Sequence, residues 1–287
     1  MPNERSPSLS ISIVCFDSSE LELGMLVTSL HESIRELRGA VELPQIVAYL
    51  IDNSEQQKLT LDIFSDLAQA LEEQQVELRL IQGHGNIGYG RGHNLVLKEL
   101  ESKYHLILNP DIRVQEECLS IGLGFLECNK DIALASPYAE YADGSKQYLC
   151  KRYPSVQTFI VRGLLPNIAK GLFKKRLARF EMHDLAEDKP SSNILLVSGC
   201  FMLFRTEVFQ KVGGFDENYF LYFEDFDLSL RLGKIAEVAY VPAMRIQHDG
   251  GHAAKKGWAH LKMFASSGIR FFNTHGWRFF SQADRTE

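Results

Sequence analysis

The residues most able to do chemistry lie in a short acidic and aromatic segment, FLYFEDFDLSLR, at residues 220–231. Glu224, Asp225 and Asp227 put three carboxylates within four residues, framed by phenylalanine and tyrosine. An apolar setting raises the pKa of a carboxylate and can turn it into a general base. The alternative is that these acids only start a helix, where the dipole favours negative charge. We expect Glu224 and Asp225 to be catalytic.

A second candidate group combines an acid and a histidine far apart in the chain. Asp111 closes the sequence Asn-Pro-Asp, which starts at Asn109 after the apolar run HLIL and is also an ordinary turn sequence. One or two carboxylates with phosphate oxygens suffice to bind Mg²⁺ or Mn²⁺. His248 follows a strand-like run, and imidazole is a common ligand of divalent transition metals. His248 is either a surface histidine or the residue that completes a metal shell with Asp111.

A glycine-rich turn, HGNIGYG at residues 84–90, precedes a helical pattern that starts at Arg91. Its spacing differs from the G-x-G-x-x-G of dinucleotide-binding proteins, and it follows the third predicted strand rather than the first, which disfavours a dehydrogenase. Glycines at this point allow the backbone to approach a nucleotide closely.

The elements that position these residues alternate between apolar strands and helical patterns. Strands are predicted at 10–16, 46–51, 76–81, 105–108 and 132–135, and helices at 20–38, 56–73, 91–101 and 114–128. This alternation predicts an α/β fold with a largely parallel sheet. Ligands of such sheets bind at the carboxyl ends of the strands. The polar or glycine-rich residues there are Asp17, Asp52 with Asn53, Gly83 to Gly90, and Asn109 with Asp111.

The second half of the chain has a different pattern. We expect a strand at 194–204, a loop at 213–223, a helix at 224–232 and a strand at 238–241 that ends at Pro242. No linker or internal repeat divides the chain, so we predict one domain with a decorated C-terminal half.

Composition narrows the class and the compartment. The chain has 287 residues, with 45% hydrophobic and 24% charged residues, as in ordinary globular proteins. Five cysteines without C-x-x-C spacing favour a reducing compartment. The N-terminus has no apolar signal core, and the most hydrophobic stretch is too short to span a bilayer, so we expect a cytoplasmic protein. A net charge of −6 disfavours nucleic acid as a partner.

Two segments, 161–180 and 250–283, carry basic residues and no acid. In the second, apolar residues recur at helical spacing beside Lys255, Lys256, Lys262, Arg270 and Arg278; they are Trp258, Leu261, Ala265, Ile269 and Phe272, with Trp277, Phe279 and Phe280 beyond. The first repeats this pattern with Leu165, Ile168, Leu172, Leu177 and Phe180. Aromatic and basic residues together are typical of helices at an anionic membrane surface. The alternative is that both helices pack on the domain.

Taken together, the motifs resemble the inverting glycosyltransferases of family 2, and within it the O-antigen type rhamnosyltransferases. The resemblance extends from about Ile11 to His248. Its landmarks are IVCFDS at 13–18, IDNS at 51–54, NIGYGRGHN at 86–94, NPD at 109–111 and the long signature from Val197 to Arg231.

The resemblance implies a GT-A fold in residues 1–248, with a nucleotide-binding half at about 10–111 and an acceptor and catalytic half at about 112–248, followed by a basic amphipathic segment at 249–287. It implies that Asp225 deprotonates the acceptor hydroxyl, with Glu224 beside it, and that Asp111 and His248 bind Mg²⁺ or Mn²⁺. The nucleotide-sugar ligands that it implies are Phe16, Asp52, Asn86, Gly88, Arg91, Asn94, Asn109 and Asp111.

The resemblance further implies rhamnosyl transfer from a dTDP-linked donor to a lipid-linked saccharide, on the inner face of the cell membrane. Two departures bear on this: Asn109 replaces the first acid of the family's D-x-D pattern, and Cys15 and Phe16 replace Thr and Tyr. The alternatives are another donor, such as a UDP-hexose or UDP-galactofuranose, and a non-catalytic scaffold that binds nucleotide sugars.

Overall fold

The computed structural model describes residues 8–40, 45–56, 59, 69, 71–164, 171–249 and 257–280. Its strands are β1 Leu9–Cys15, β2 Ile46–Asp52, β3 Val76–Ile81, β4 Tyr104–Leu108, β5 Ile112–Val114, β6 Ile132–Glu140, β7 Lys146–Gln147, β8 Cys150–Lys151, β9 Leu196–Val197, β10 Phe201–Arg205 and β11 Glu237–His248. Its α-helices are α1 Glu20–Ala40, α3 Tyr89–Asn94, α4 Cys118–Cys128, α5 Val156–Leu164, α7 Lys174–Phe180, α8 Thr206–Lys211, α9 Glu224–Leu232 and α10 Trp258–His275. Two 3₁₀ turns, η2 Leu97–Glu99 and η3 Gly171–Phe173, complete the described elements.

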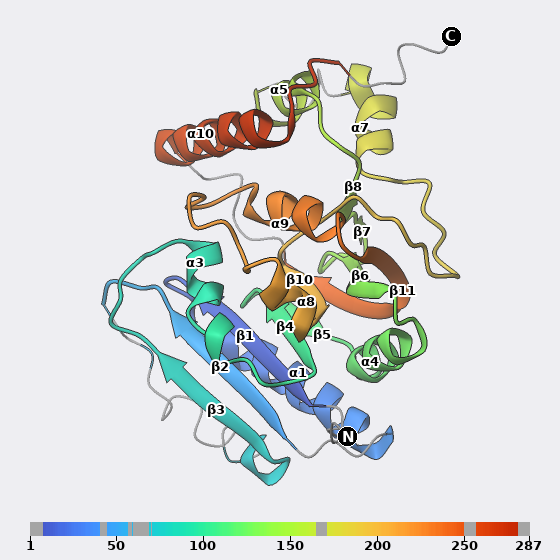
Figure 1. Cartoon of the computed structure of the whole chain (residues 1–287). Coiled ribbons are helices and arrows are strands. Elements are labelled where there is room, and N and C mark those ends of the chain that lie inside the picture. The colour runs from blue at the N-terminus through green and yellow to red at the C-terminus, as the bar shows by residue number, and fades with distance from the viewer. Residues whose placement is uncertain are drawn as a thin grey trace.

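One curled sheet forms the centre of the molecule, with strand order β3-β2-β1-β4-β10-β6-β11-β5 and β7 added beside β6 (Figure 1). β1 is parallel to both β2 and β4, and β2 is parallel to β3. β10 then runs antiparallel to β4 and β6. The predicted α/β architecture with a helix-flanked central sheet is confirmed. Its parallel pairs are β3–β2, β2–β1 and β1–β4 in the N-terminal half and β6–β11 in the C-terminal half.

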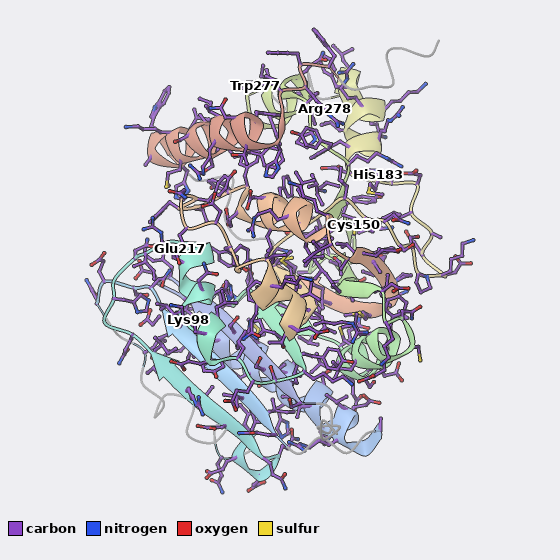
Figure 2. The ribbon with its side chains drawn as sticks, viewed as in Figure 1. Lys98, Cys150, His183, Glu217, Trp277 and Arg278 are labelled. Carbon is purple, nitrogen blue, oxygen red and sulfur yellow. The ribbon has the colours of Figure 1, made fainter. Side chains whose placement is uncertain are left out.

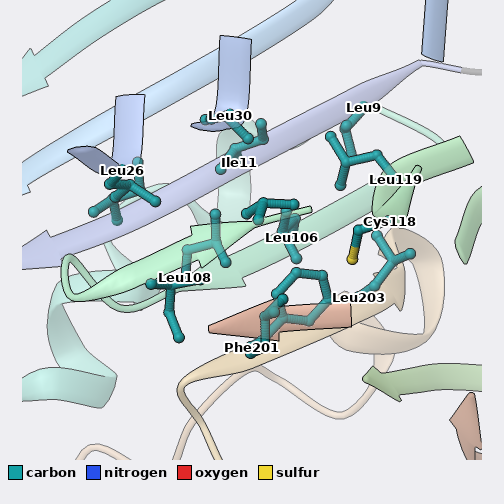
Figure 3. Packing of buried hydrophobic residues seen from close by; sticks show 14 of the residues in the cluster. Leu9, Ile11, Leu26, Leu30, Leu106, Leu108, Cys118, Leu119, Phe201 and Leu203 are labelled. Carbon is teal, nitrogen blue, oxygen red and sulfur yellow. The ribbon is translucent and has the colours of Figure 1, made fainter. Parts of the chain in front are cut away.

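The main core lies between this sheet and helices α1 and α4. Leu26 and Leu30 of α1 pack near Ile11 of β1 and Leu106 of β4 in one buried cluster (Figure 3). The six apolar residues that recur at helical spacing in the predicted 20–38 helix are all buried; they are Leu23, Leu26, Val27, Leu30, Ile34 and Leu37. A fully buried leucine contributes about 2 kcal/mol, so this face holds α1 against the sheet.

Three predicted elements differ from the structure. The predicted helix 114–128 begins only at Cys118, because Val114 belongs to β5 and pairs with Ile246 of β11. The predicted helix 91–101 is a short α3 followed by η2. The predicted strand 132–135 continues to Glu140, where its second half pairs with β7 and β11. The predicted helix 56–73 lies mostly outside the described residues.

Two further differences fall beside the site. The predicted strand 194–204 is split into β9 and β10, because β9 pairs with β8 in a separate two-stranded sheet while β10 belongs to the central sheet. Gly199, between the two strands, donates its backbone N–H to Asp225. The predicted strand 238–241 continues through Pro242 to His248. A register shift between Val241 and Arg245 accommodates the missing N–H of proline, as bulges commonly do.

A second, aromatic layer lies at the end of the molecule where α5, α7 and α10 gather above α9 (Figure 1). Its rings form one buried cluster, in which Phe223 lies 4.9 Å from Phe159 of α5 and 5.4 Å from Phe271 of α10, centroid to centroid. The inner face of α10 is therefore part of the folded body, while the predicted boundary at residue 248 stays a prediction. Among the described helices, none combines the length and the apolar character needed to cross a bilayer.

Candidate active site

The donor edge is the row of polar residues at the carboxyl ends of β1 and β2. Parallel pairing sets Cys15 opposite Asp52, so the residues that follow each strand emerge together. Asp52 is fully buried; its Oδ1 accepts the backbone N–H of Ser54 at 2.9 Å, while its Oδ2 is buried without a hydrogen-bond partner. Phe16 is 53% exposed at the end of β1. A buried carboxylate oxygen without a partner and an open aromatic ring suit a nucleobase, which offers N–H groups and a flat face.

The glycine-rich turn lies against the same edge. The Asn53 side chain donates to the Gly88 carbonyl at 3.0 Å, and Asn86 accepts the Gly88 N–H at 3.2 Å. Gly88 has a φ of 92°, and a Cβ there would lie 2.4 Å from the carbonyl oxygen of Phe220. Only glycine fits this contact, which joins the donor edge to the loop that precedes α9.

Two predicted nucleotide ligands point elsewhere. Arg91 donates to the Glu217 carbonyl at 2.6 Å, and Asn94 exchanges two hydrogen bonds with the Phe215 backbone at 2.9 Å each. Both side chains therefore hold the loop at 213–219 in place. Asn109 lies at the end of β4, where its backbone N–H donates to the Cys200 carbonyl at 2.9 Å. Contact of these three residues with a nucleotide stays a prediction.

The register of β5 and β11 brings Asp111 and His248 together across 137 positions of chain. His248 pairs with Ile112, the residue after Asp111, and the Asp249 N–H donates to the Asp111 carbonyl. The two side chains meet with His248 Nε2 3.2 Å from Asp111 Oδ1, and they are 13% and 12% exposed. The sequence alone left open whether His248 lies beside Asp111, and the register of the sheet brings the two residues together.

This pair fits a divalent cation. Ligand atoms about 2.1 Å from one ion and at right angles lie roughly 3 Å apart, close to the observed 3.2 Å. Burial lowers the pKa of His248, but the Cys200 side chain and the Asp111 carboxylate raise it more, to about 11. A bound cation would take the place of that proton. Within the described part of the chain, no third histidine, cysteine or acid joins the pair as a ligand group, so a cation here would also need phosphate oxygens or water.

The backbone at the start of α9 orients the Asp225 side chain. Tyr222 and Phe223 both have positive φ, at 72° and 68°, which is uncommon for aromatic residues and typical of strained functional turns. Asp225 Oδ2 accepts the Gly199 N–H at 2.9 Å, and Oδ1 accepts the Phe226 N–H at 2.8 Å. Two backbone donors therefore fix the carboxylate while the residue stays partly exposed.

Glu224 is the acid whose pKa responds to the apolar setting. It is 5% exposed, and burial, followed by the negative charge of Asp225, raises its pKa to about 8. At neutral pH this carboxyl is mostly protonated, so it stands as a neutral group beside the Asp225 side chain. The rise in carboxylate pKa that we expect from the aromatic residues of this segment is therefore found at Glu224.

Asp227 is not part of the site, although the sequence grouped it with the other two acids. Its carboxylate is 2% exposed and bonds Arg231 Nε at 2.7 Å and His275 Nε2 at 2.8 Å. The helix turns it away from Asp225, and it ties α9 to α10. Its role is structural.

A cavity of about 1020 Å³ opens in front of these acids. Glu224, Asp225 and His248 contribute carboxyl and imidazole groups to its lining. The lining also contains apolar side chains, including Phe159 of α5 and Phe264 of α10. Polar side chains complete the wall; they are Lys146, Gln147, Tyr148, Lys151, Glu181, His183 and His260. His183, labelled in Figure 2, stacks on Tyr148 at 3.6 Å between ring centroids.

Sequence reasoning missed three residues of this arrangement. Gly199 positions Asp225, and the Tyr89 hydroxyl donates to the Gly199 carbonyl at 2.7 Å. Gln147 Oε1 lies 2.6 Å from His248 Nδ1. The glycine stands inside the quoted signature and was within reach of sequence analysis. Gln147 stands in a polar, turn-rich stretch that carries no motif.

Comparison with solved structures supports the GT-A fold. GalNAc-T7, solved with UDP, GalNAc and Mn²⁺, superposes with a TM-score of 0.59 at 16% identity over 86% of this chain and 44% of its own. TarS of S. aureus, residues 1–349 with UDP, gives 0.53 at 16% identity over 96% and 73%. Identities this low establish the fold alone.

Sequence comparison identifies rhamnosyltransferases as relatives. Rhamnosyltransferase WbbL of Escherichia coli K12 is 28% identical over 177 residues, 58% of this chain and 63% of its own length. N-acetylglucosaminyl-diphospho-decaprenol L-rhamnosyltransferase of Mycobacterium tuberculosis is 27% identical over 198 residues, 64% and 63%. The match thus spans under two thirds of these relatives. A profile of glycosyl transferase family 2 matches residues 10–213, well over half of the chain. The predicted family is confirmed: the chain belongs to glycosyl transferase family 2.

Proposed function

We propose that the chain is an inverting glycosyltransferase that moves L-rhamnose from dTDP-L-rhamnose to a lipid-linked saccharide in bacterial O-antigen or related cell-surface polysaccharide synthesis. The observation that carries the proposal is the cavity, whose lining combines Asp225 and His248 with aromatic side chains. A sugar hydroxyl can approach the carboxylate there, while an apolar carrier lies along the rings. The rhamnosyl preference rests on the names of the two relatives.

In this mechanism Asp225 accepts the proton of the acceptor hydroxyl. The Gly199 and Phe226 N–H groups hold its two oxygens in place before the reaction, which reduces the reorganisation needed in the transition state. The protonated Glu224 adds no second negative charge beside the attacking oxygen. The oxygen then displaces the nucleoside diphosphate in a single step, which inverts the anomeric carbon.

The donor would lie along the donor edge, with its base at Phe16 and Asp52 and its diphosphate near Asp111. Asp111 and His248 would hold Mg²⁺ or Mn²⁺ there. The cation supplies neutralisation of the charge that builds on the departing diphosphate.

The test is a transfer assay with dTDP-L-rhamnose, UDP-glucose and UDP-galactofuranose, each with a lipid-diphosphate-linked sugar acceptor. We expect only the dTDP donor to be consumed, with an inverted anomer in the product. EDTA should stop the reaction and Mg²⁺ or Mn²⁺ should restore it. Use of a UDP donor instead would reassign the sugar, and full activity in excess EDTA would remove the cation. Consumption of no donor would favour the scaffold alternative.

We further propose that the protein acts as a peripheral protein on the cytoplasmic face of the membrane, bound through the outer side of α10 and its neighbours. Exposed apolar side chains gather on this end of the molecule, which we name the lipid-facing patch; they are Leu172, Trp258, Leu261, Ile269, Trp277, Phe279 and Phe280. Trp277 is labelled in Figure 2. Leu261 also lines the cavity, so an apolar carrier can leave the cavity directly into lipid.

Part of the predicted membrane pattern faces inward. Phe272 and Phe180 are buried in the aromatic layer. Arg270 pairs with Asp216 at 2.8 Å and Arg278 lies over the Tyr153 ring at 4.1 Å. Among the described basic residues of the two segments, the exposed ones are Lys174, Lys175, Arg179, Lys262 and Arg278. Other predicted members lie outside the described residues; they are Leu165, Ile168, Lys170, Lys255 and Lys256.

Liposome sedimentation tests this surface. Wild type should bind anionic vesicles more than neutral ones, and salt should weaken the binding. The double change Trp258→Ser with Ile269→Ser should reduce it, while Leu21→Ser, at a residue 73% exposed on α1, should not. Reversing Lys174, Lys175 and Lys262 to Glu should lower binding by at least fivefold per residue, since each basic residue contributes about 1 kcal/mol. Binding that ignores lipid charge, or equal loss in the Leu21 variant, would refute the patch.

A further inference from the structure

Gln147 owes its place beside the candidate cation pair to three neighbouring strands. On β7 it pairs with Ala139 of β6, and Ala139 in turn pairs with Ile246 of β11. His248 lies two residues beyond Ile246 on the same strand, so its ring comes within reach of the Gln147 side chain. The contact joins Gln147 Oε1 to His248 Nδ1 at 2.6 Å, although 101 positions of chain separate the two residues.

This contact determines which nitrogen of His248 can face a cation. A carbonyl oxygen only accepts hydrogen bonds, so Nδ1 must carry the proton that it donates to Gln147. In a neutral imidazole the lone pair then stands on Nε2. Nε2 is the atom 3.2 Å from Asp111 Oδ1, on the side where the cation would bind. Oxygen acceptors behind metal-binding histidines fix ring orientation in the same way.

We propose that Gln147 is a positioning residue that holds His248 as the Nδ1–H tautomer and turns Nε2 toward the cation shared with Asp111. The inference rests on the proposed function, because it requires a cation at that pair. Gln147 also lines the cavity in front of Asp225. The same side chain therefore stands between the acceptor side and the cation side of the site.

The experiment measures Mn²⁺ binding by electron paramagnetic resonance in the presence of dTDP, without acceptor or turnover. Gln147→Met removes the oxygen acceptor and keeps a side chain of similar length, and it should weaken Mn²⁺ binding about 10- to 100-fold. Gln147→Glu keeps an acceptor oxygen and should retain the affinity. Gln247→Met is the matched control, since the Gln247 side chain bonds Arg113 and the Tyr141 carbonyl instead. The affinity for dTDP without metal should be equal in all four proteins.

A second readout follows the ring itself. ¹⁵N chemical shifts of His248 in the Mg²⁺-loaded protein should report a protonated Nδ1 in wild type and Gln147→Glu, and a mixture of forms in Gln147→Met. Equal Mn²⁺ affinity of wild type and Gln147→Met, or equal loss in the Met and Glu variants, would overturn the role of Gln147. If wild type itself binds no Mn²⁺, the cation site of the proposed function is wrong and the inference falls with it.

Discussion

The donor edge and the cavity in front of Asp225 are built from different kinds of contact. At the donor edge, parallel strands carry their end residues to one row, as Cys15 and Asp52 illustrate. The cavity instead takes its walls from α5, α9, α10 and the segment that follows α7. Local chain geometry is sufficient for the first, whereas the second exists only when distant helices pack. We therefore expect the effect on stability and the effect on catalytic rate to be easier to tell apart for substitutions in these helices than for substitutions at the strand ends.

The two halves also bury polar groups in different ways. Below the donor edge, Ser10 and Ser12 bond the ring of His105, and Ser12 also bonds His93, in a buried network of neutral groups. In the aromatic layer the buried group is Asp227, which carries charge and depends on partners from α9 and α10. The first half should therefore be sensitive to acid, and the second to loss of a single charge.

The largest effect should come from Asp227→Ala. This change leaves Arg231 and His275 facing a site without its carboxylate, and breaking a buried ion pair costs about 3–5 kcal/mol. Urea unfolding at pH 7 measures the loss. Asp216→Ala is the matched control, because its pair with Arg270 also anchors α10 but is more exposed, so it should cost no more than about 1 kcal/mol. Similar losses of unfolding free energy in both variants would show that the buried Asp227 pairs stabilise the protein no more than the exposed Asp216 pair does.

The next effect concerns the acid two residues earlier. Asp225→Asn should lower the rate of transfer at least ~100-fold, the scale of a lost general base, and should leave donor affinity unchanged. The measurements are kcat and donor binding by calorimetry. Loss of donor affinity in parallel with rate would contradict the assigned role.

Glu224→Gln sharpens this test. Because burial keeps Glu224 largely protonated at pH 7, glutamine reproduces its neutral state and we expect a loss below about tenfold. If the Gln variant instead loses more than the Asn variant, Glu224 is the base and Asp225 its electrostatic neighbour.

The four strands of residues 9–108, helix α1 between the first two of them and the site segments at the strand ends could be predicted from sequence. The apolar spacing of α1 and the β-branched runs of β1 and β2 leave little choice of element. α9 was also predicted at its observed bounds, because the acids of its first turn mark a helix start. Motifs of this kind are local, so one sequence is enough to read them.

The rest depends on contacts that no local pattern encodes. The break at Gly199 exists because β9 pairs with β8 while β10 pairs with β4 and β6. The extension of β11 past Pro242 exists because β5 and β6 offer partners. Asp227 could not be told from Asp225 by residue type, since only the positions of Arg231 and His275 separate them. Gln147 has no signal at all until β7 is paired with β6.

The smallest effect, per pH unit, should come from the buried histidines of the donor half. Burial lowers the pKa of His105 to about 3, and burial together with His105 lowers the pKa of His93. In the unfolded chain a histidine takes up its proton near pH 6.5. Between about pH 6.5 and pH 3 the unfolded state therefore binds a proton that folded His105 refuses. The stability due to the neutral ring is complete above pH 6.5 and is lost as the pH falls, by about 1.4 kcal/mol per pH unit for each such group.

Urea unfolding from pH 7.5 to pH 5 should show this dependence of the unfolding free energy on pH in wild type. His105→Gln should reduce the slope by the contribution of one proton, about 1.4 kcal/mol per pH unit. Equal slopes in wild type and His105→Gln would mean that the neutral state of the buried His105 does not stabilise the N-terminal half. The difference that we draw between this neutral network and the charged Asp227 would then be wrong.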